Sequence, residues 1–181
     1  DYGNPGANVT WLTDRGVIDK LNNLVIMGLM PSDDKREVSC KLVNRFTMDK
    51  HIEVLSDPVI LNVEYYPIIK YNASDILIVN ETQSISVFCE AIGNPNPQSV
   101  QWKNGLDGSM LRFDNISRMD KGTCICEATA FSTKYGTLTS QKQLEIIVQY
   151  APDVKVTLIG STHQSQIAIL ICEAQGIPAQ Y

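Results

Sequence analysis

An internal repeat with a period of about 86 residues limits what this chain can fold into. The sequence VEYYP at 63–67 returns as VQYAP at 148–152, and CEAIGNP at 89–95 returns as CEAQGIP at 172–178. A unit of this length has the size of a domain, whereas the repeats of solenoid proteins are roughly 20 to 45 residues long. The 181 residues therefore predict a row of small, independently packed domains.

Within each unit, short apolar or β-branched runs alternate with turn residues. Three such runs in the middle unit are 85–89, 100–102 and 143–148. Gly, Pro, Asn and Asp separate them at intervals of roughly 8 to 12 residues, and helical periodicity is sustained nowhere. Short strands with regular turns predict an all-β fold of antiparallel sandwiches or barrels.

The middle unit carries a Cys…Trp…Cys pattern made by Cys89, Trp102 and Cys126. Just before the last cysteine, Asp120 and Gly122 lie in DKGTCIC, which resembles the Asp-x-Gly-x-Tyr-x-Cys signature of strand F in immunoglobulin domains. The resemblance implies tandem immunoglobulin-like antiparallel β-sandwiches. It also implies that a disulfide between Cys89 and Cys126 joins the two sheets and that Trp102 packs against it.

Cys124 stands where this signature has tyrosine. The tyrosine hydroxyl normally bonds back to the backbone, and a thiol makes a weaker bond, so some local rigidity should be lost. Because side chains alternate along a strand, Cys124 and Cys126 face the same way and either could approach Cys89, although the signature spacing favours Cys126. We expect Cys124 to be a small buried apolar residue. Disulfide exchange or a bond to a partner chain are the alternatives, and both would need exposure.

The first and third units carry parts of the same pattern. Trp11 is followed by DKREVSC, in which Asp34 and Cys40 match the signature while Arg36 replaces its glycine. Cys172 ends an apolar run that resembles strand B. We expect residues 1–65 to be a partial domain from strand C onward, 66–150 a complete domain, and 151–181 strands A and B of a third. The partners of Cys40 and Cys172 would then lie outside this chain.

The spacing between tryptophan and the second cysteine favours compact domains. Only 24 residues separate Trp102 from Cys126, and 29 separate Trp11 from Cys40. This leaves little room for the C′ and C″ strands of a variable-type domain, so the C2 or I type is predicted.

The Val-x-Tyr-x-Pro linkers and the Gly-Asn-Pro after Cys89 resemble the C2-type repeats of nephrin and its partner family, hemicentin and the sialoadhesin group. The resemblance implies an extracellular adhesion or recognition module that binds another immunoglobulin-superfamily or matrix protein, homophilically or heterophilically, through sandwich faces or edges. The alternative is a secreted or surface immune-recognition molecule that binds microbial or carbohydrate ligands. The short linker implies a semi-rigid rod, with Tyr65 and Tyr66 packed between neighbouring sandwiches.

Charge and glycosylation motifs agree with an extracellular setting. A net charge of -5 and a pI near 5.0, without a basic cluster, argue against a nucleic-acid partner. No apolar run approaches the roughly 18 residues of a membrane-spanning helix, so any membrane attachment is expected outside this fragment. Four N-glycosylation sequons indicate an oxidising secretory route, and their asparagines are Asn8, Asn72, Asn80 and Asn115.

Residues suited to catalysis are few. The histidines His51 and His163 fall in different units, and the pair Cys124 and Cys126 has one residue between its cysteines instead of the two of a redox or zinc motif. The acidic pair at Asp33 and Asp34 could suggest calcium, but the signature already accounts for Asp34. We therefore predict no enzymatic activity, no metal and no cofactor.

Overall fold

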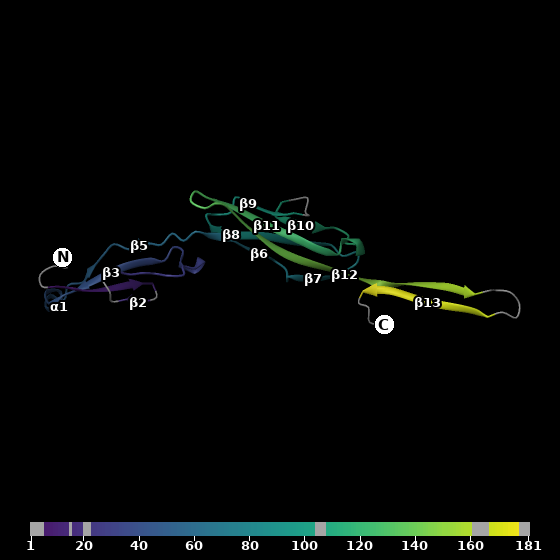
Figure 1. Ribbon diagram of the computed structural model, residues 1–181, viewed down its shortest axis with the longest axis horizontal. Coiled ribbons are helices and arrows are strands. Elements are labelled where there is room, and N and C mark those ends of the chain that lie inside the picture. The colour runs from purple at the N-terminus through teal and green to yellow at the C-terminus, as the bar shows by residue number, and fades with distance from the viewer. Residues whose placement is uncertain (1–5, 15, 20–22, 104–107, 161–166, 178–181) are drawn as a thin grey trace.

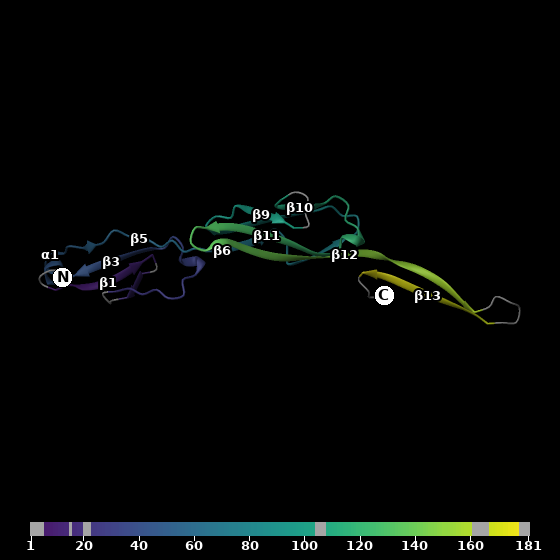
Figure 2. The same cartoon turned by 45° about the horizontal axis from the view of Figure 1, so that its top comes forward.

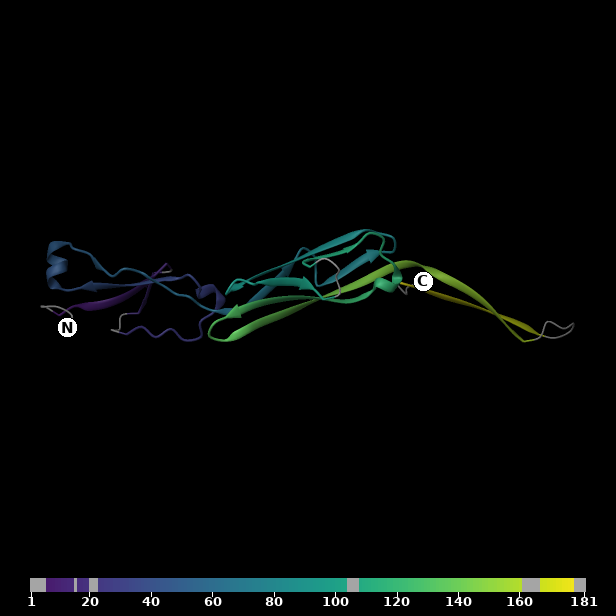
Figure 3. The same ribbon diagram turned by 90° about the horizontal axis from the view of Figure 1, so that it is seen from above.

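The computed structural model describes residues 6–14, 16–19, 23–103, 108–160 and 167–177, and these form an elongated rod (Figure 1). A small sheet at the N-terminal end, a two-sheet sandwich in the middle and a two-stranded ribbon at the C-terminal end follow one another along its axis. Figures 2 and 3 show the same order from two further directions. The architecture is all-β, as the sequence predicted.

The first sheet is antiparallel and has the order β2-β1-β3-β4, with β5 also paired to β3. Its strands are β1 (Asn8–Thr13), β2 (Gly16–Asp19), β3 (Glu37–Val43), β4 (Val54–Leu55) and β5 (Val59–Ile60). Strand β2 pairs with the tryptophan strand β1 and takes the place of C′, for which the sequence spacing had seemed to leave little room.

Two short helical segments also belong to this region, η1 (Pro31–Asp33) and α1 (Arg45–Lys50). Helix α1 was not expected, because six residues are too few to show a helical period. Its N-terminus is capped by Asn44, whose side chain accepts a hydrogen bond of 2.9 Å from the Thr47 backbone N–H. The helix ends at His51, which adopts a left-handed conformation and is exposed.

The middle sandwich consists of two sheets, and the chain crosses between them more than once. The first sheet has the order β10-β8-β6. The second contains β7, β12, β11 and β9 in that order. The strands are β6 (Tyr65–Tyr71), β7 (Ile76–Asn80), β8 (Ile85–Asn94), β9 (Ser99–Trp102), β10 (Met110–Phe113), β11 (Gly122–Ser132) and β12 (Gly136–Gly160), with η2 (Arg118–Asp120) before β11.

The pairing of β7 with β12 is parallel, whereas the other strand pairs of the described residues are antiparallel. The chain crosses from one sheet to the other between β6 and β7, so that β7 covers the edge strand β12. No pattern in the sequence indicated this parallel pair. Strand β12 therefore has both of its edges paired within the sandwich, and β7 becomes the edge strand of this sheet.

The core of the sandwich follows from the period of two along its strands. In β12, Leu144, Ile146 and Val148 are fully buried or nearly so, whereas Glu145 between them is exposed. Burying each such side chain stabilises the fold by roughly 1.5–3 kcal/mol. These residues pack with Val87, Leu111 and Ile116 from the other side of the sandwich and its loops.

Strand β12 does not end at the expected boundary near Ala151 and Pro152. It runs on to Gly160 and pairs antiparallel with β13 (Ala168–Ile177), which forms the C-terminal ribbon. The ladder is irregular between Tyr150 and Asp153. Because proline has no N–H to give to a ladder, such an irregularity is where a strand can accommodate it.

Candidate binding surfaces

The predicted signature residues of the middle sandwich meet in its core. Cys89 on β8 and Cys126 on β11 form a disulfide with a Cα–Cα distance of 6.5 Å. Trp102 on β9 is 2% exposed, is the direct neighbour of Cys126 across the strands, and donates from Nε1 to the Ser109 carbonyl at 3.1 Å. In the first sheet, Trp11 and Cys40 are direct neighbours in the same way, although Cys40 is a free, half-buried thiol.

Cys124 is a free thiol that is 7% exposed, and it lies with Cys126 in the core cluster. Burial raises its pKa above the ordinary value of a thiol. A buried, protonated thiol is a poor nucleophile, so the structure favours the interpretation of Cys124 as a small apolar residue. Cys172 on β13 is free and exposed.

The strand F signature is displaced by one residue in the first unit. In the middle sandwich Asp120 accepts a hydrogen bond of 2.8 Å from the Ser117 backbone, and Gly122 has a φ of 141°, which essentially only glycine adopts. In the first unit the equivalent carboxylate belongs to Asp33, which accepts from the Met30 backbone at 2.8 Å. The residue with positive φ there is Lys35 at 63°, so Asp34 and Arg36 do not hold the Asp and Gly positions of the signature.

Asp34 instead joins the first unit to the middle sandwich. Its Oδ1 accepts from the Val63 backbone N–H at 3.0 Å and from the Asn94 side-chain amide at 2.9 Å. The same amide nitrogen lies 2.7 Å from Asn62 Oδ1 and 3.0 Å from the Val63 carbonyl. Asn94 therefore ties the end of β8 to both the first unit and the linker, a role that the sequence had not indicated.

The linker is also fixed to the turn between β11 and β12. The hydroxyl of Ser132, which is fully buried, donates to Glu64 Oε2 and accepts from the backbone N–H groups of Lys134 and Tyr135 at 3.1 and 3.0 Å. One hydroxyl thus holds both the turn and the linker carboxylate. These contacts tie the linker to the middle sandwich.

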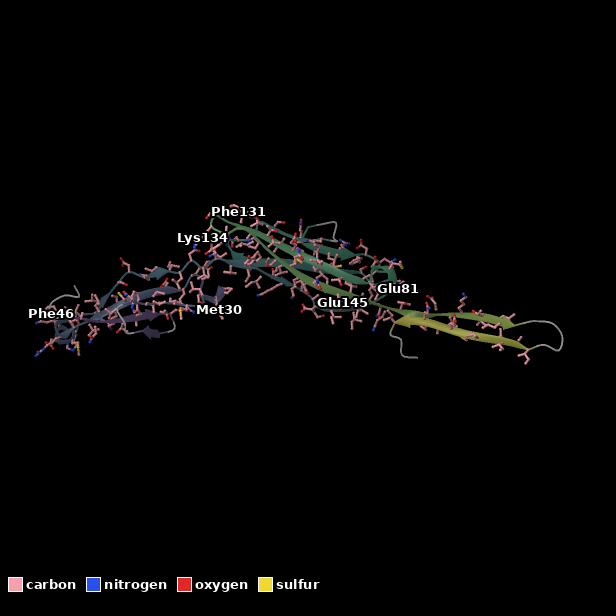
Figure 4. The ribbon with its side chains drawn as sticks, viewed as in Figure 1. Met30, Phe46, Glu81, Phe131, Lys134 and Glu145 are labelled. Atoms are coloured by element: carbon pink, nitrogen blue, oxygen red, sulfur yellow. A yellow bond between two sulfur atoms is a disulfide. The ribbon has the colours of Figure 1, made fainter. Side chains whose placement is uncertain are left out.

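Aromatic side chains gather around this first junction. Tyr66 is 61% exposed, and Tyr135 and Phe131 are 60% and 53% exposed. Tyr65 is half-buried, so only one member of the tyrosine pair is partly covered between the neighbouring units, and Tyr66 faces solvent. Figure 4 shows Phe131 and Lys134 at the tip of the middle sandwich that points toward the first sheet.

The second junction is organised by Arg118 of η2. Its guanidinium binds both carboxylate oxygens of Glu81 at 3.0 Å, pairs with Asp153 of the C-terminal ribbon, and lies 4.1 Å from the ring centre of Tyr150. The hydrogen bonds from Arg118 hold the pKa of Glu81 below its usual value. A cleft of about 450 Å³ beside these residues is lined by Asn80, Thr82, Gln149 and Ile177, among others.

Tyr71 links the two sheets of the sandwich where the chain switches between them. Its hydroxyl lies 2.8 Å from Asp75 Oδ1 and 2.7 Å from the Gln143 carbonyl, and its ring carries the Lys142 ammonium at 4.2 Å. Burial, together with the hydrogen bond to Asp75, raises the pKa of Tyr71 to about 12.

The four sequon asparagines are exposed. Asn80 closes β7 and Asn115 precedes η2, so both lie at the end of the middle sandwich nearest the C-terminal ribbon, whereas Asn72 follows β6 and bonds to Phe88 partway along the sandwich. The Thr82 backbone N–H donates to the Ile116 carbonyl at 2.7 Å and the Ile116 N–H donates to the Gln83 carbonyl at 2.9 Å, so the segments of Asn80 and Asn115 lie side by side. Asn8 begins β1, where it pairs with Val43 close to α1. No sequon lies at the first junction.

Residues that could form a metal site or a catalytic site are few in the described part of the chain. No group of three or more His, Cys, Asp or Glu side chains within the described ranges could hold a metal ion. His51 stands alone, and His163 lies outside the described residues. None of the helices in the described ranges is long and apolar enough to cross a membrane.

The chain matches no protein-family model. Cell adhesion molecule 4 of Homo sapiens is 24% identical over 202 residues, which cover 96% of this chain and 50% of that protein. IgLON family member 5 of Homo sapiens is 26% identical over 112 residues, which cover 59% of this chain and 32% of that protein. The chain thus spans about half the length of cell adhesion molecule 4 and about a third of the length of IgLON family member 5.

Among solved structures, the full three-domain ectodomain of mouse nectin-like molecule 4 superposes with a TM-score of 0.53 at 22% identity, covering 80% of this chain and 55% of that one. This likeness concerns the fold. The two-sheet topology, the Cys89–Cys126 bridge beside Trp102 and this likeness identify the fold as that of tandem immunoglobulin-like β-sandwiches, in a chain whose sequence is similar to cell adhesion molecules.

Proposed function

We propose that this chain is an extracellular part of a cell-surface adhesion protein and that it binds another protein. The observation that carries the proposal is the similarity to cell adhesion molecule 4, which extends over 96% of the chain instead of one isolated domain. The relatives that cover most of the chain are named as cell adhesion molecules.

The proposed organisation is a partial immunoglobulin-like domain at 1–65, a complete one at 66–150 and the first two strands of a third at 151–181. The one-sheeted first unit and the two-stranded ribbon support this division, because an isolated ribbon is marginally stable in water and normally packs against further strands. We further propose glycans on Asn8, Asn72, Asn80 and Asn115, all of which are exposed.

The outer face of β6 and β8 supports binding through a sandwich face. Ile68 and Ile92 lie directly opposite each other on these strands and are 40% and 54% exposed. Phe88, further along β8, is half exposed on the same face. Apolar and aromatic side chains that protrude together from an otherwise polar surface are typical of protein–protein contacts.

Two-colour bead aggregation tests the proposal. Beads of one colour carry the 181-residue chain, and beads of the other carry either the same chain or the ectodomains of other immunoglobulin-superfamily and matrix proteins. We expect aggregates that disappear when free chain is added in excess. Mixed aggregates with the same chain identify homophilic binding, and aggregates with another ectodomain identify heterophilic binding.

Absence of aggregation with every protein-coated bead, together with saturable binding to an array of glycans, would contradict the proposal. That result would favour a carbohydrate-binding recognition molecule instead. Reduction of the Cys89–Cys126 disulfide is a control, because it should abolish protein binding by loosening the sandwich.

A further inference from the structure

A small hollow at the first junction combines aromatic rings with a single carboxylate. It has a volume of about 260 Å³ and is lined by Glu64, Tyr65, Tyr66, Tyr135 and Leu138. Leu138 is buried, whereas two of the three tyrosines are more than half exposed. In this tyrosine hollow the exposed rings are therefore accessible to an incoming group, whereas the buried Leu138 is held within the sandwich.

The parts of the tyrosine hollow are held in place before any ligand arrives. Ser132 binds the Glu64 carboxylate from one side and the backbone of Tyr135 from the other. Tyr65 belongs to β6 and pairs with Asn94 of β8, whose side chain fixes the linker. A site that is already ordered loses little conformational entropy when it binds a ligand.

The chain itself already places a cation on one of these rings. Lys134 Nζ lies 5.0 Å from the ring centre of Tyr135, within the range of a cation–π contact. The pKa of Lys134 is raised by its hydrogen bond to Tyr135 and, more weakly, by the negative charge of Glu64. The electrostatic field of Glu64 thus reaches the position of a cation beside Tyr135.

Aromatic faces beside one carboxylate suit a guanidinium better than an ammonium. A guanidinium is planar, stacks on aromatic rings, pairs with a carboxylate through two parallel N–H groups and is more weakly hydrated than an ammonium. Arginine is also among the side chains that dominate protein interfaces, where aromatic residues are its frequent neighbours.

We propose that the tyrosine hollow binds the guanidinium of an arginine side chain on the partner protein, between its tyrosine rings and the Glu64 carboxylate. This proposal rests on the proposed function, because a protein partner supplies the arginine. The position of the sequons agrees with it: Asn80 and Asn115 lie at the opposite end of the middle sandwich and Asn72 lies partway along it, so none of these asparagines lines the hollow.

The site is tested without a partner by nuclear magnetic resonance titration of the 181-residue chain. The probes are N-acetyl-arginine amide and N-acetyl-citrulline amide, which have nearly the same shape and differ in charge. We expect the arginine probe to shift the amide signals of residues 64–66 and 132–136, with an affinity about five-fold higher than that of the citrulline probe.

Paired variants separate the local effect from net charge. Glu64→Gln keeps an oxygen that can accept from Ser132 and should weaken arginine-probe binding about five-fold. Glu145→Gln makes the same change of charge at an exposed position away from the tip, and should leave binding unaltered (Figure 4). Lys134→Ala should strengthen binding about two-fold by freeing the Tyr135 ring, while Lys70→Ala should have no effect.

Equal affinities for the two probes, or equal effects of Glu64→Gln and Glu145→Gln, would overturn the proposal. Its failure is distinguishable from failure of the proposed function. If the arginine probe binds but beads that carry the chain do not aggregate, the partner-protein function is refuted and the guanidinium site remains. If the beads aggregate but the probe does not bind, only the guanidinium site is refuted.

Discussion

Replacing Ser132 with Ala removes one oxygen from the middle sandwich and should destabilise it well beyond what that atom's size suggests. The hydroxyl makes three hydrogen bonds from a fully buried position, one to Glu64 and two to backbone N–H groups of the following turn. Each such bond stabilises a fold by about 0.5–1.5 kcal/mol, and Glu64 can recover its share from water. The two bonds to backbone N–H groups then give an expected loss of about 1–3 kcal/mol in the free energy of unfolding.

Urea unfolding measures this loss. Trp102 fluorescence reports on the sandwich core when the other tryptophan is removed by Trp11→Phe. For a domain with a slope of about 2 kcal/mol per molar urea, the midpoint should fall by about 0.5–1.5 M at an unchanged slope. Ser140→Ala is the matched control, because Ser140 is half-buried on the neighbouring strand and should cost less than about 0.5 kcal/mol.

The reasoning is refuted if Ser132→Ala and Ser140→Ala shift the midpoint equally. That result would mean that the two turn amides find other partners and that Ser132 does not organise the first junction. The tyrosine hollow would then lose the rigidity on which its proposed binding depends.

Three further predictions concern other parts of the rod. Because Arg118 lowers the pKa of Glu81, the stabilisation from this pair is present above the unfolded pKa of Glu81 and is lost as pH falls through its lower folded value. The protection factor of the Glu81 amide, which is the intrinsic exchange rate at each pH divided by the observed rate, should therefore fall selectively in acid and in Arg118→Gln, but not in Arg112→Gln. An equal fall in both variants would refute a specific role of Arg118. Because the folded pKa of Tyr71 is raised to about 12, its contribution is complete below pH 10 and is lost between 10 and 12. Tyr71→Phe should flatten the alkaline decline in the unfolding free energy, and an unchanged decline would contradict this assignment. Under native conditions a maleimide should label the exposed Cys172 quickly and the buried Cys124 slowly, as measured by mass spectrometry. Similar rates would show that Cys124 is accessible.

The features that the sequence could predict depend on residues whose chemistry permits few alternatives. Two cysteines and a tryptophan at immunoglobulin spacing, set in alternating apolar strands, are enough to predict the sandwich and its bridge. The signature glycine is equally informative, because the backbone at Gly122 has a φ that essentially only glycine adopts.

The junctions could not be predicted because they depend on long-range geometry. Arg118 and Asp153 are 35 residues apart and meet only because β12 runs on into the ribbon. Asp33 and Asp34 are adjacent aspartates, and spacing to Cys40 favoured Asp34 because the first unit has one more residue between its capping carboxylate and its cysteine. Because of this one extra residue, counting back from the cysteine by the distance found in the middle unit leads to Asp34 instead of Asp33.

The continuity of β12 determines how the rod would respond to tension. A pull along the axis enters the middle sandwich through the linker before β6 and leaves through the far end of β12. Strands β7 and β12 are parallel neighbours and would be drawn in opposite directions, so the hydrogen bonds between residues 76–80 and 145–149 would be loaded together and not one after another. Shear of this kind resists force far better than unzipping, and it places the mechanical strength of the middle sandwich in the parallel pair of β7 and β12.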